Sequence, residues 1–290
     1  MFNLIIAVLC SVAVSVLLKV ARKRHIEIQQ AIAFNYIVAL SLSWFLLKPD
    51  FKGLEFTDFI AQSENTPIFL ALGILLPSVF IIMSKAVEFA GIVRSDAAQR
   101  LSLFLPILAA FLIFHETLSQ SKVVGIVLAF VGLFCLLSKP NQQSAVDFRG
   151  VLGLVGVWFG YGIIDILFKQ VAKSGGAFPT TLFIAFSLAA CIMFIYLLFK
   201  RTQWNVASVV GGIILGGLNF FNILFYIKAH QSFGSNPTLV FAGMNIGVIC
   251  LGTITGALIF KEKISKVNWL GIVFSLCAIF CLYYLDKILA

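Results

Sequence analysis

Long apolar segments, separated by short polar ones, fill the chain from end to end. Each apolar segment is roughly 17 to 25 residues long, enough for one helix to cross the hydrocarbon of a bilayer. The pattern therefore predicts an all-α integral membrane protein. Ten transmembrane helices are expected, at about residues 3–19, 30–47, 67–87, 95–114, 121–138, 150–170, 177–199, 207–229, 236–260 and 267–285. Pro106, in the middle of the fourth segment, predicts a kink there.

One stretch of the chain occurs twice. Residues 112–136 and 258–282 are identical at eleven of twenty-five aligned positions, at a constant shift of 146. The shared positions include Glu116/Glu262, Ser119/Ser265, Gly125/Gly271 and Cys135/Cys281. The chain is therefore predicted to be a duplication, with a first repeat at residues 1–139 and a second at residues 150–287.

Each predicted repeat contains five spans, which is an odd number. The second copy must then enter the membrane in the opposite orientation to the first, which gives two inverted five-helix repeats related by a pseudo-two-fold axis in the membrane plane. Two such halves can exchange conformations. This exchange would open a central site first to one side of the membrane and then to the other.

The composition agrees with a membrane location. Hydrophobic residues make up 61% of the chain and charged residues 11%, too little polar surface to cover a soluble globule of 290 residues. The basic cluster from Lys19 to Arg24 follows the first apolar segment, so that segment is expected to be a permanent span and not a signal peptide. The basic residues that give the net charge of +9 lie at span ends, which favours contact with lipid headgroups over binding of nucleic acid.

Motifs for metal, redox or covalent chemistry are missing from the sequence. All six cysteines lie in apolar segments without a CxxC pair, and they are expected to be small core residues. The pair His115-Glu116 is followed by Ser119 where a zinc protease needs histidine. No enzyme activity, metal or cofactor is expected. Glu116 and Glu262 each precede a turn, which favours a helix-end role. Cys277 and Cys281 lie one turn apart, and a homodimer contact through them stays open.

Polar residues recur at helical spacing on two related spans. The sixth span carries Tyr161, Asp165 and Lys169, with Trp158 one turn earlier, and the first span carries Ser11, Ser15 and Lys19. Both stripes are expected to face the interior. Asp165 and Lys169 either neutralise each other as an i,i+4 pair, or Asp165 is a protonatable or substrate-binding group, because an isolated charge at mid-bilayer costs about 3 kcal/mol or more.

A second polar face lies on the eighth span. Asn219, Asn222, Tyr226 and His230 are spaced three, four and four residues apart. This face is expected to line a polar cavity, although an asparagine can instead bond a neighbouring helix at about 1 kcal/mol. In the fourth span Gln99 aligns with Asn245 of the ninth. Arg100 either pairs with Asp96 one turn earlier or captures a substrate carboxylate.

Several motifs resemble a known family. Tyr226 to Ala229, Asn236-Pro237, Leu258 to Glu262 and Trp269 to Gly271 are similar to the second EamA unit of the drug/metabolite transporter superfamily. Lys85-Ala86, Pro106, Glu116 and Gly125 resemble the first unit. The resemblance implies a ten-helix fold with a central cavity, peripheral fifth and tenth helices, and transport of small organic solutes by alternating access. These motifs describe the fold and do not identify the substrate.

We therefore expect a secondary active transporter of a small polar or zwitterionic, amino-acid-like metabolite in the bacterial inner membrane. The expected substrate-binding residues are Trp158, Tyr161, Asp165, Asn219, Asn222, Tyr226, Gln99 and Asn245. Asp165 is the candidate for proton coupling, because a carboxyl in a low-dielectric site can bind and release a proton during the cycle.

Three alternatives stay open. They are an exchanger of anionic sugar phosphates or nucleotide sugars, a passive channel, and a lipid-moving or partner-binding membrane subunit. An anion exchanger predicts more cationic groups in the cavity than Arg100, and a lipid-moving subunit predicts a lateral opening. Fourteen of the 21 Lys and Arg residues fall on the side of the loop between the first two spans, which predicts that both termini lie outside.

Overall fold

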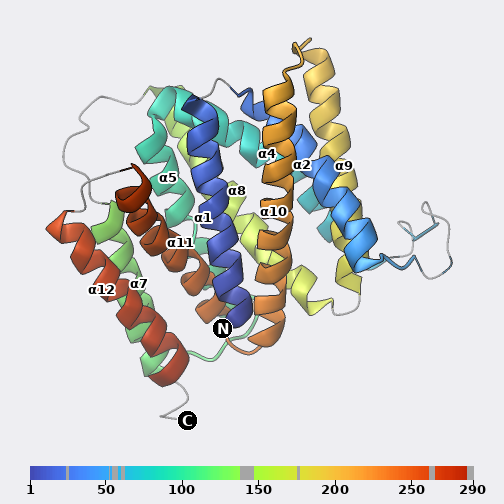
Figure 1. Ribbon diagram of the computed structural model, residues 1–290. Coiled ribbons are helices and arrows are strands. Elements are labelled where there is room, and N and C mark those ends of the chain that lie inside the picture. The colour runs from blue at the N-terminus through green and yellow to red at the C-terminus, as the bar shows by residue number, and fades with distance from the viewer. Residues whose placement is uncertain are drawn as a thin grey trace.

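The computed structural model describes residues 1–23, 26–51, 53, 58–59, 63–137, 147–174, 177–260 and 265–285. All regular secondary structure in these ranges is helical (Figure 1). The elements are α1 (Phe2–Lys23), α2 (Ile28–Leu42), the π-helical η1 (Ser43–Leu47), α4 (Thr66–Ala90), α5 (Ile92–Leu101), α6 (Phe104–Leu112), α7 (Gln120–Leu137), α8 (Phe148–Lys173), α9 (Phe178–Phe199), α10 (Val206–Ser232), α11 (Pro237–Phe260), α12 (Lys266–Phe280) and the π-helical η3 (Cys281–Leu285).

The predicted spans agree with these helices. Nine helical segments of the described chain are long and apolar enough to cross a membrane, and the apolar stretch Phe2–Leu18 of α1 is somewhat shorter. Large apolar side chains such as Phe2, Leu112, Phe199 and Leu258 are exposed on the outside of the bundle. A bilayer would cover this apolar outer surface, so the multi-pass membrane fold is confirmed.

The fourth span is divided into two helices. α5 ends at Leu101 and α6 begins at Phe104, and Ser102 and Leu103 form a turn between them. Proline has no backbone N–H, so Pro106 cannot donate to the carbonyl of Ser102. The kink predicted at Pro106 is confirmed. α11, the counterpart in the second repeat, runs unbroken, so this break belongs to one half of the molecule only.

The helix packing has the two-fold pattern expected for inverted repeats (Figure 1). If the two halves are exchanged, α1 corresponds to α8, α2 to α9, α4 to α10 and α7 to α12. α2 packs on α10, and α9 correspondingly packs on α4. α1 packs on α10, and α8 likewise packs on α4. Each major contact thus has a partner contact in the other half.

α7 and α12 lie side by side at one edge of the bundle (Figure 1). Their glycines permit this close approach, since a Cβ atom added to Gly125 would lie 2.7 Å from Cγ of Leu282. A Cβ atom added to Gly271 would lie 2.8 Å from Cγ of Leu136. The peripheral position implied for the fifth and tenth spans agrees with this pair, which leaves the other helices to enclose the centre.

Candidate functional site

Asp165 lies near the middle of α8 and is half-buried. The side chains of Tyr226 on α10 and Asn245 on α11 approach its carboxyl group, and Arg100 on α5 and Tyr161 on α8 are close enough to interact with its charge. The structure therefore brings together four of the predicted site residues, from three different helices, with Arg100 beside them.

Tyr36 on α2 is a further site residue, which the polar pattern of the sequence did not predict. Its side chain is fully buried and lies close to Tyr161. The sequence carried a weak signal here, because Asn35 and Tyr36 form an adjacent polar pair inside an apolar segment. We call Tyr36, Arg100, Tyr161, Asp165, Tyr226, His230 and Asn245 the central cluster.

Several polar atoms of the central cluster have no hydrogen-bond partner among the described residues. They are the hydroxyl groups of Tyr36 and Tyr226, both ring nitrogens of His230 and Nε of Arg100. Leaving a buried donor or acceptor unsatisfied costs about 1–3 kcal/mol, so such groups are uncommon in a purely structural core. Other atoms of the described residues without a hydrogen-bond partner lie outside the cluster, on Asn35, Glu116, Thr202 and Ser275. The central cluster differs from them in combining five such atoms with the carboxyl group of Asp165, as expected of a site that receives a polar ligand.

His230 lies between two aromatic rings. Its ring centroid is 4.8 Å from that of Tyr226 and 4.7 Å from that of Phe241. His230 lies one turn after Tyr226 on α10, so their contact extends the central cluster along this helix. The imidazole is fully buried, which leaves its two nitrogens available only to a group that enters the cluster.

Lys169 does not neutralise Asp165. Its ammonium group donates a hydrogen bond of 3.1 Å to the carbonyl of Gly234, and it lies 5.9 Å from the ring centre of Phe114. No ion pair joins Lys169 to Asp165, both of which belong to the described residues. The interpretation of these two residues as a self-neutralising pair is therefore not supported, and Asp165 has Arg100 as its neighbouring cation.

Arg100 and Asp96 form the intrahelical pair that their spacing predicts. The distance between Nη2 of Arg100 and Oδ1 of Asp96 is 3.5 Å, and about half of the Asp96 side chain is exposed. One face of the guanidinium group is thus paired while its Nε stays free. Gln99 is half-buried on the same helix, but it is not among the neighbours of Asp165.

Trp158 supports the break in the fourth span. Its Nε1 donates a hydrogen bond of 3.0 Å to the carbonyl of Leu101. The backbone N–H of Leu105 donates to the carbonyl of Ser102 instead of to that of Leu101. The carbonyl of Leu101 is therefore available to Trp158. The indole of this predicted site residue therefore holds α8 against the α5–α6 break, one turn from Tyr161.

The predicted polar face of α10 is divided between two environments. Nδ2 of Asn222 donates a hydrogen bond of 2.8 Å to the carbonyl of Ala7, which joins α10 to α1. Asn219 is half-buried one turn earlier. Tyr226 and His230, by contrast, belong to the central cluster. The alternative prediction, that an asparagine in this face bonds a neighbouring helix, therefore applies to Asn222.

The end of the bundle where α1 begins is closed by buried polar contacts. Glu116 is 8% exposed, and its Oε2 accepts hydrogen bonds from the backbone N–H (3.0 Å) and the hydroxyl group (2.7 Å) of Thr238. Nζ of Lys122 lies 3.2 Å from Oε1 of Glu116. The helix-end role predicted for Glu116 is confirmed, and Glu262 lies outside the described residues. We call this end of the bundle, where α1 begins, the sealed end. The hydrogen bond from Lys169 to Gly234 also lies there.

The opposite half of α1 is less covered. Leu4, Ala7 and Ser11 share one face of α1, and Leu4 and Ala7 are buried on it. Ser15 continues the same face one turn later, yet it is exposed. The inward face predicted for Ser11 and Ser15 is thus packed near the sealed end and uncovered towards the other end, from which solutes could approach the central cluster.

Comparison with known proteins identifies the family. A model of the EamA-like transporter family matches residues 1–138. A protein of Haemophilus influenzae strain KW20 / Rd, named only as uncharacterized, is 84% identical over 291 residues, with 100% of both chains covered. The chain belongs to the EamA-like transporter family. It is therefore a multi-pass membrane protein of a transporter family, as the resemblance implied.

A solved crystal structure shares the fold of this EamA-like transporter. It aligns with 99% of this chain and 97% of its own at a TM-score of 0.73, and the two sequences are 14% identical. The likeness covers both halves, so it includes the part of the chain beyond residue 138. At this level of identity it carries information about the fold alone.

Proposed function

We propose that this EamA-like transporter is a secondary active transporter of a small zwitterionic, amino-acid-like metabolite. The observation that carries the proposal is the juxtaposition of Asp165 and Arg100 among buried polar atoms without partners. A carboxylate and a guanidinium group on different helices suit the ammonium and carboxylate groups of one zwitterion. The central cluster would hold the substrate between α5 and α8.

The unpartnered polar atoms of the central cluster favour the binding of a polar substrate. The hydroxyl groups of Tyr36 and Tyr226 and the imidazole of His230 are buried without hydrogen bonds, at a cost of about 1–3 kcal/mol for each unsatisfied group. A polar ligand that supplies these bonds recovers part of that cost, whereas an apolar ligand of the same size does not. This difference favours a small substrate with several polar groups.

Asp165 is the proposed site of proton coupling. An ionised carboxyl group is expensive to keep inside a membrane, so Asp165 gains either from a proton or from a bound ammonium group. The two would compete for the same carboxylate. Competition of this kind makes substrate release depend on protonation, which couples the transport of the substrate to a proton moving in the opposite direction.

The sealed end supports alternating access over a passive channel. Glu116 with Thr238, and Lys169 with Gly234, close one end of the bundle, while Ser15 is exposed towards the other. A continuous pore would need both ends open together. By the distribution of Lys and Arg, the sealed end would face the outside of a bacterial inner membrane.

An anion exchanger fits the central cluster less well. Sugar phosphates and nucleotide sugars carry one or more negative charges, and they would call for several cations in the site. Arg100 is paired with Asp96, and Lys169 is engaged by the carbonyl of Gly234. The carboxyl group of Asp165 would also repel an anion. A zwitterion needs only the unpartnered Nε of Arg100 for its carboxylate, and its ammonium group would be attracted by Asp165.

Reconstituted protein in proteoliposomes tests the proposal. We expect saturable uptake and counterflow of amino-acid-like solutes, and an imposed pH gradient should drive them. Asp165→Asn should abolish the pH dependence, whereas Glu88→Gln, which removes an exposed acid on α4 outside the central cluster, should keep it. If Asp165→Asn transports with an unchanged pH dependence, the coupling role is wrong. Transport of anions in place of zwitterions would overturn the substrate class.

A further inference from the structure

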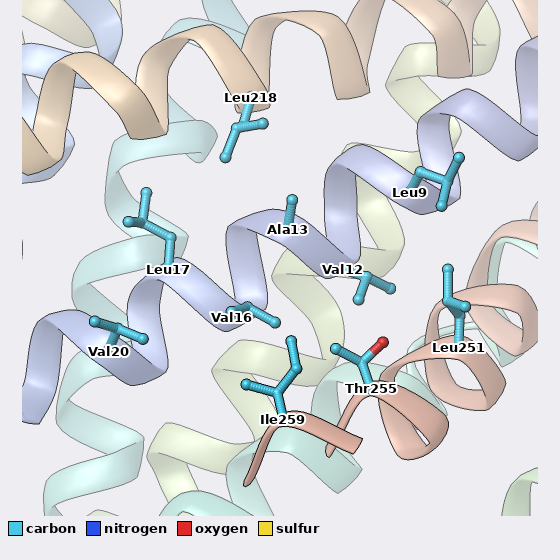
Figure 2. A pocket seen from close by; sticks show the side chains of 10 residues that line it. All are labelled: Leu9, Val12, Ala13, Val16, Leu17, Val20, Leu218, Leu251, Thr255 and Ile259. Atoms are coloured by element: carbon cyan, nitrogen blue, oxygen red, sulfur yellow. The ribbon is translucent and has the colours of Figure 1, made fainter. Parts of the chain in front are cut away.

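A second candidate binding site lies on the side of the bundle. A groove of about 500 Å³ runs along α1 where α10 and α11 flank it (Figure 2). It is lined by Leu9, Val12, Ala13, Val16, Leu17, Val20, Leu218, Leu251, Thr255 and Ile259. None of these residues belongs to the central cluster, so the groove is separate from the proposed transport site.

The groove spans the depth of one leaflet. On α1 it extends from Leu9 to Val20, roughly 16 Å at 1.5 Å per residue. The hydrocarbon core of a bilayer is about 30 Å thick, so half of it is close to this length. The groove therefore begins near the middle of the membrane and reaches its surface where α1 ends.

The lining determines what kind of molecule fits. Nine of the ten lining residues are aliphatic, and the hydroxyl of Thr255 is the remaining polar group. Aromatic and charged side chains are missing from this lining, which disfavours a ring-stacked or ionic ligand. A volume of 500 Å³ is also far too small for another protein helix, which is about 10–12 Å across with its side chains. A single flexible hydrocarbon chain fits the volume and the chemistry.

The groove faces the bilayer. Leu9 is 51% exposed and Ile259 is 60% exposed, although both are apolar and lie within membrane spans. α1 packs most closely on α11 near its start, where Leu4 meets Gly243 and Val8 meets Gly247. Beyond that point the two helices leave the groove between them. Lipid would fill it in a membrane.

The sequence places basic residues in the last turns of α1, where the groove ends. The last turns of α1 carry Lys19, Arg22 and Lys23 in the sequence, directly around Val20 at the end of the groove. Lys266, which opens α12 at the same end of the bundle, is exposed. Basic residues at this depth attract the phosphate groups of anionic lipids.

We propose that this groove binds one acyl chain of an anionic phospholipid, whose phosphate group lies at the basic end of α1. The acyl chain fills the space between α1 and α11, and the basic residues select the charge of the headgroup. The bound lipid then stabilises the half of α1 that protein contacts leave uncovered. This site goes beyond the proposed transport function and does not depend on it.

Lipid retention in native mass spectrometry tests the site. Purified protein is mixed with phosphatidylglycerol or with phosphatidylcholine that has the same acyl chains. We expect one phosphatidylglycerol to be retained at least tenfold better than phosphatidylcholine. Ala13→Trp, which fills the groove, should remove this retention, whereas Val127→Trp at a lipid-facing position of α7 should keep it. Equal retention by Ala13→Trp and the parent protein would overturn the proposal.

Two further measurements keep the test independent of how Ala13→Trp folds. Phosphatidylglycerol with a photoreactive group on its acyl chain should label residues 9–20 of the unmodified protein. The triple variant Lys19→Gln, Arg22→Gln, Lys23→Gln should lose the preference for phosphatidylglycerol. Labelling elsewhere, or an unchanged preference, contradicts the site. Cross-linking of Ala13→Cys to a second copy of the chain would show that a protein partner covers the groove instead.

Discussion

Glu116 closes the N-terminus of α11 through Thr238, whose backbone N–H and hydroxyl both bond to one carboxylate oxygen. The other oxygen faces Lys122, so the carboxylate connects the start of α7 with the start of α11. The first backbone N–H groups of a helix have no partner within the helix and carry its positive dipole end. A buried carboxylate is therefore well placed at this point.

Glu116→Ala should destabilise the protein by about 3–5 kcal/mol, because it removes the only carboxylate that the structure places beside the buried ammonium group of Lys122 in the described residues. Thermal unfolding in detergent measures the effect. The double variant Glu116→Ala, Lys122→Met removes both charges and should recover part of the loss. A single variant as stable as the parent protein would show that this contact does not hold the sealed end.

Tyr226→Phe should separate stability from function. The hydroxyl of Tyr226 is buried beside the carboxyl group of Asp165 but makes no hydrogen bond of regular geometry, so its removal should change stability by no more than about 1 kcal/mol. Substrate affinity should fall at least tenfold, since the substrate loses a partner. Tyr36→Phe is expected to behave in the same way, and Tyr196→Phe on α9 is the control. Lower stability with unchanged affinity would indicate a structural role.

Asn222→Leu should lower stability by about 1 kcal/mol, the typical strength of a hydrogen bond between membrane helices. The lost bond is that from Nδ2 of Asn222 to the carbonyl of Ala7. Asn219→Leu, one turn away, is the matched control and should change stability less. A variant that loses substrate binding at full stability would instead place Asn222 in the transport site.

Gly125→Ala should destabilise the α7–α12 pair by about 1–3 kcal/mol, the usual effect of overpacking. The new Cβ atom would lie 2.7 Å from Cγ of Leu282, which must move. Leu282→Ala should restore stability to the Gly125→Ala variant, because it removes the obstructing atoms. Leu136→Ala truncates the equivalent leucine of the first repeat and should not restore it. Equal rescue by both leucine variants would contradict the proposed contact.

A reporter fused to the C-terminus should be active outside the cytoplasm. The distribution of Lys and Arg among the loops predicts this orientation, and the even number of predicted spans puts the N-terminus on the same side. Paired reporters that are active only inside or only outside the cytoplasm provide the measurement. Activity in the cytoplasm alone would reverse the orientation and place the sealed end inside.

The spans and the fold class could be predicted from the sequence because the bilayer imposes them. A membrane helix must be long and apolar to satisfy its backbone groups, and this requirement leaves a strong pattern. The break near Pro106 was predictable for a similar reason, since proline removes a specific backbone donor. The boundaries of the two repeats, 1–139 and 150–287, stay a prediction from the duplication.

The candidate site was less predictable because its contacts join distant parts of the chain. The partners of Asn222, Trp158 and Lys169 are backbone carbonyls, and a carbonyl has no signature in the sequence. Tyr36 was missed because its partner residues lie on other helices. The residues that did come together, Tyr161, Asp165, Tyr226 and Asn245, each stood out as a polar residue inside an apolar segment. Their role in binding stays a prediction.

The seam between α7 and α12 contains the same contact twice. Gly125 meets Leu282, and Gly271 meets Leu136; a shift of 146 residues converts one pair into the other. In a symmetric dimer, residue i of one copy contacts residue j of its partner and residue j contacts residue i. The seam thus has the form of a dimer interface joined within a single chain. Each half carries, in its own fifth helix, the glycine and the leucine needed to pair with an inverted copy of itself.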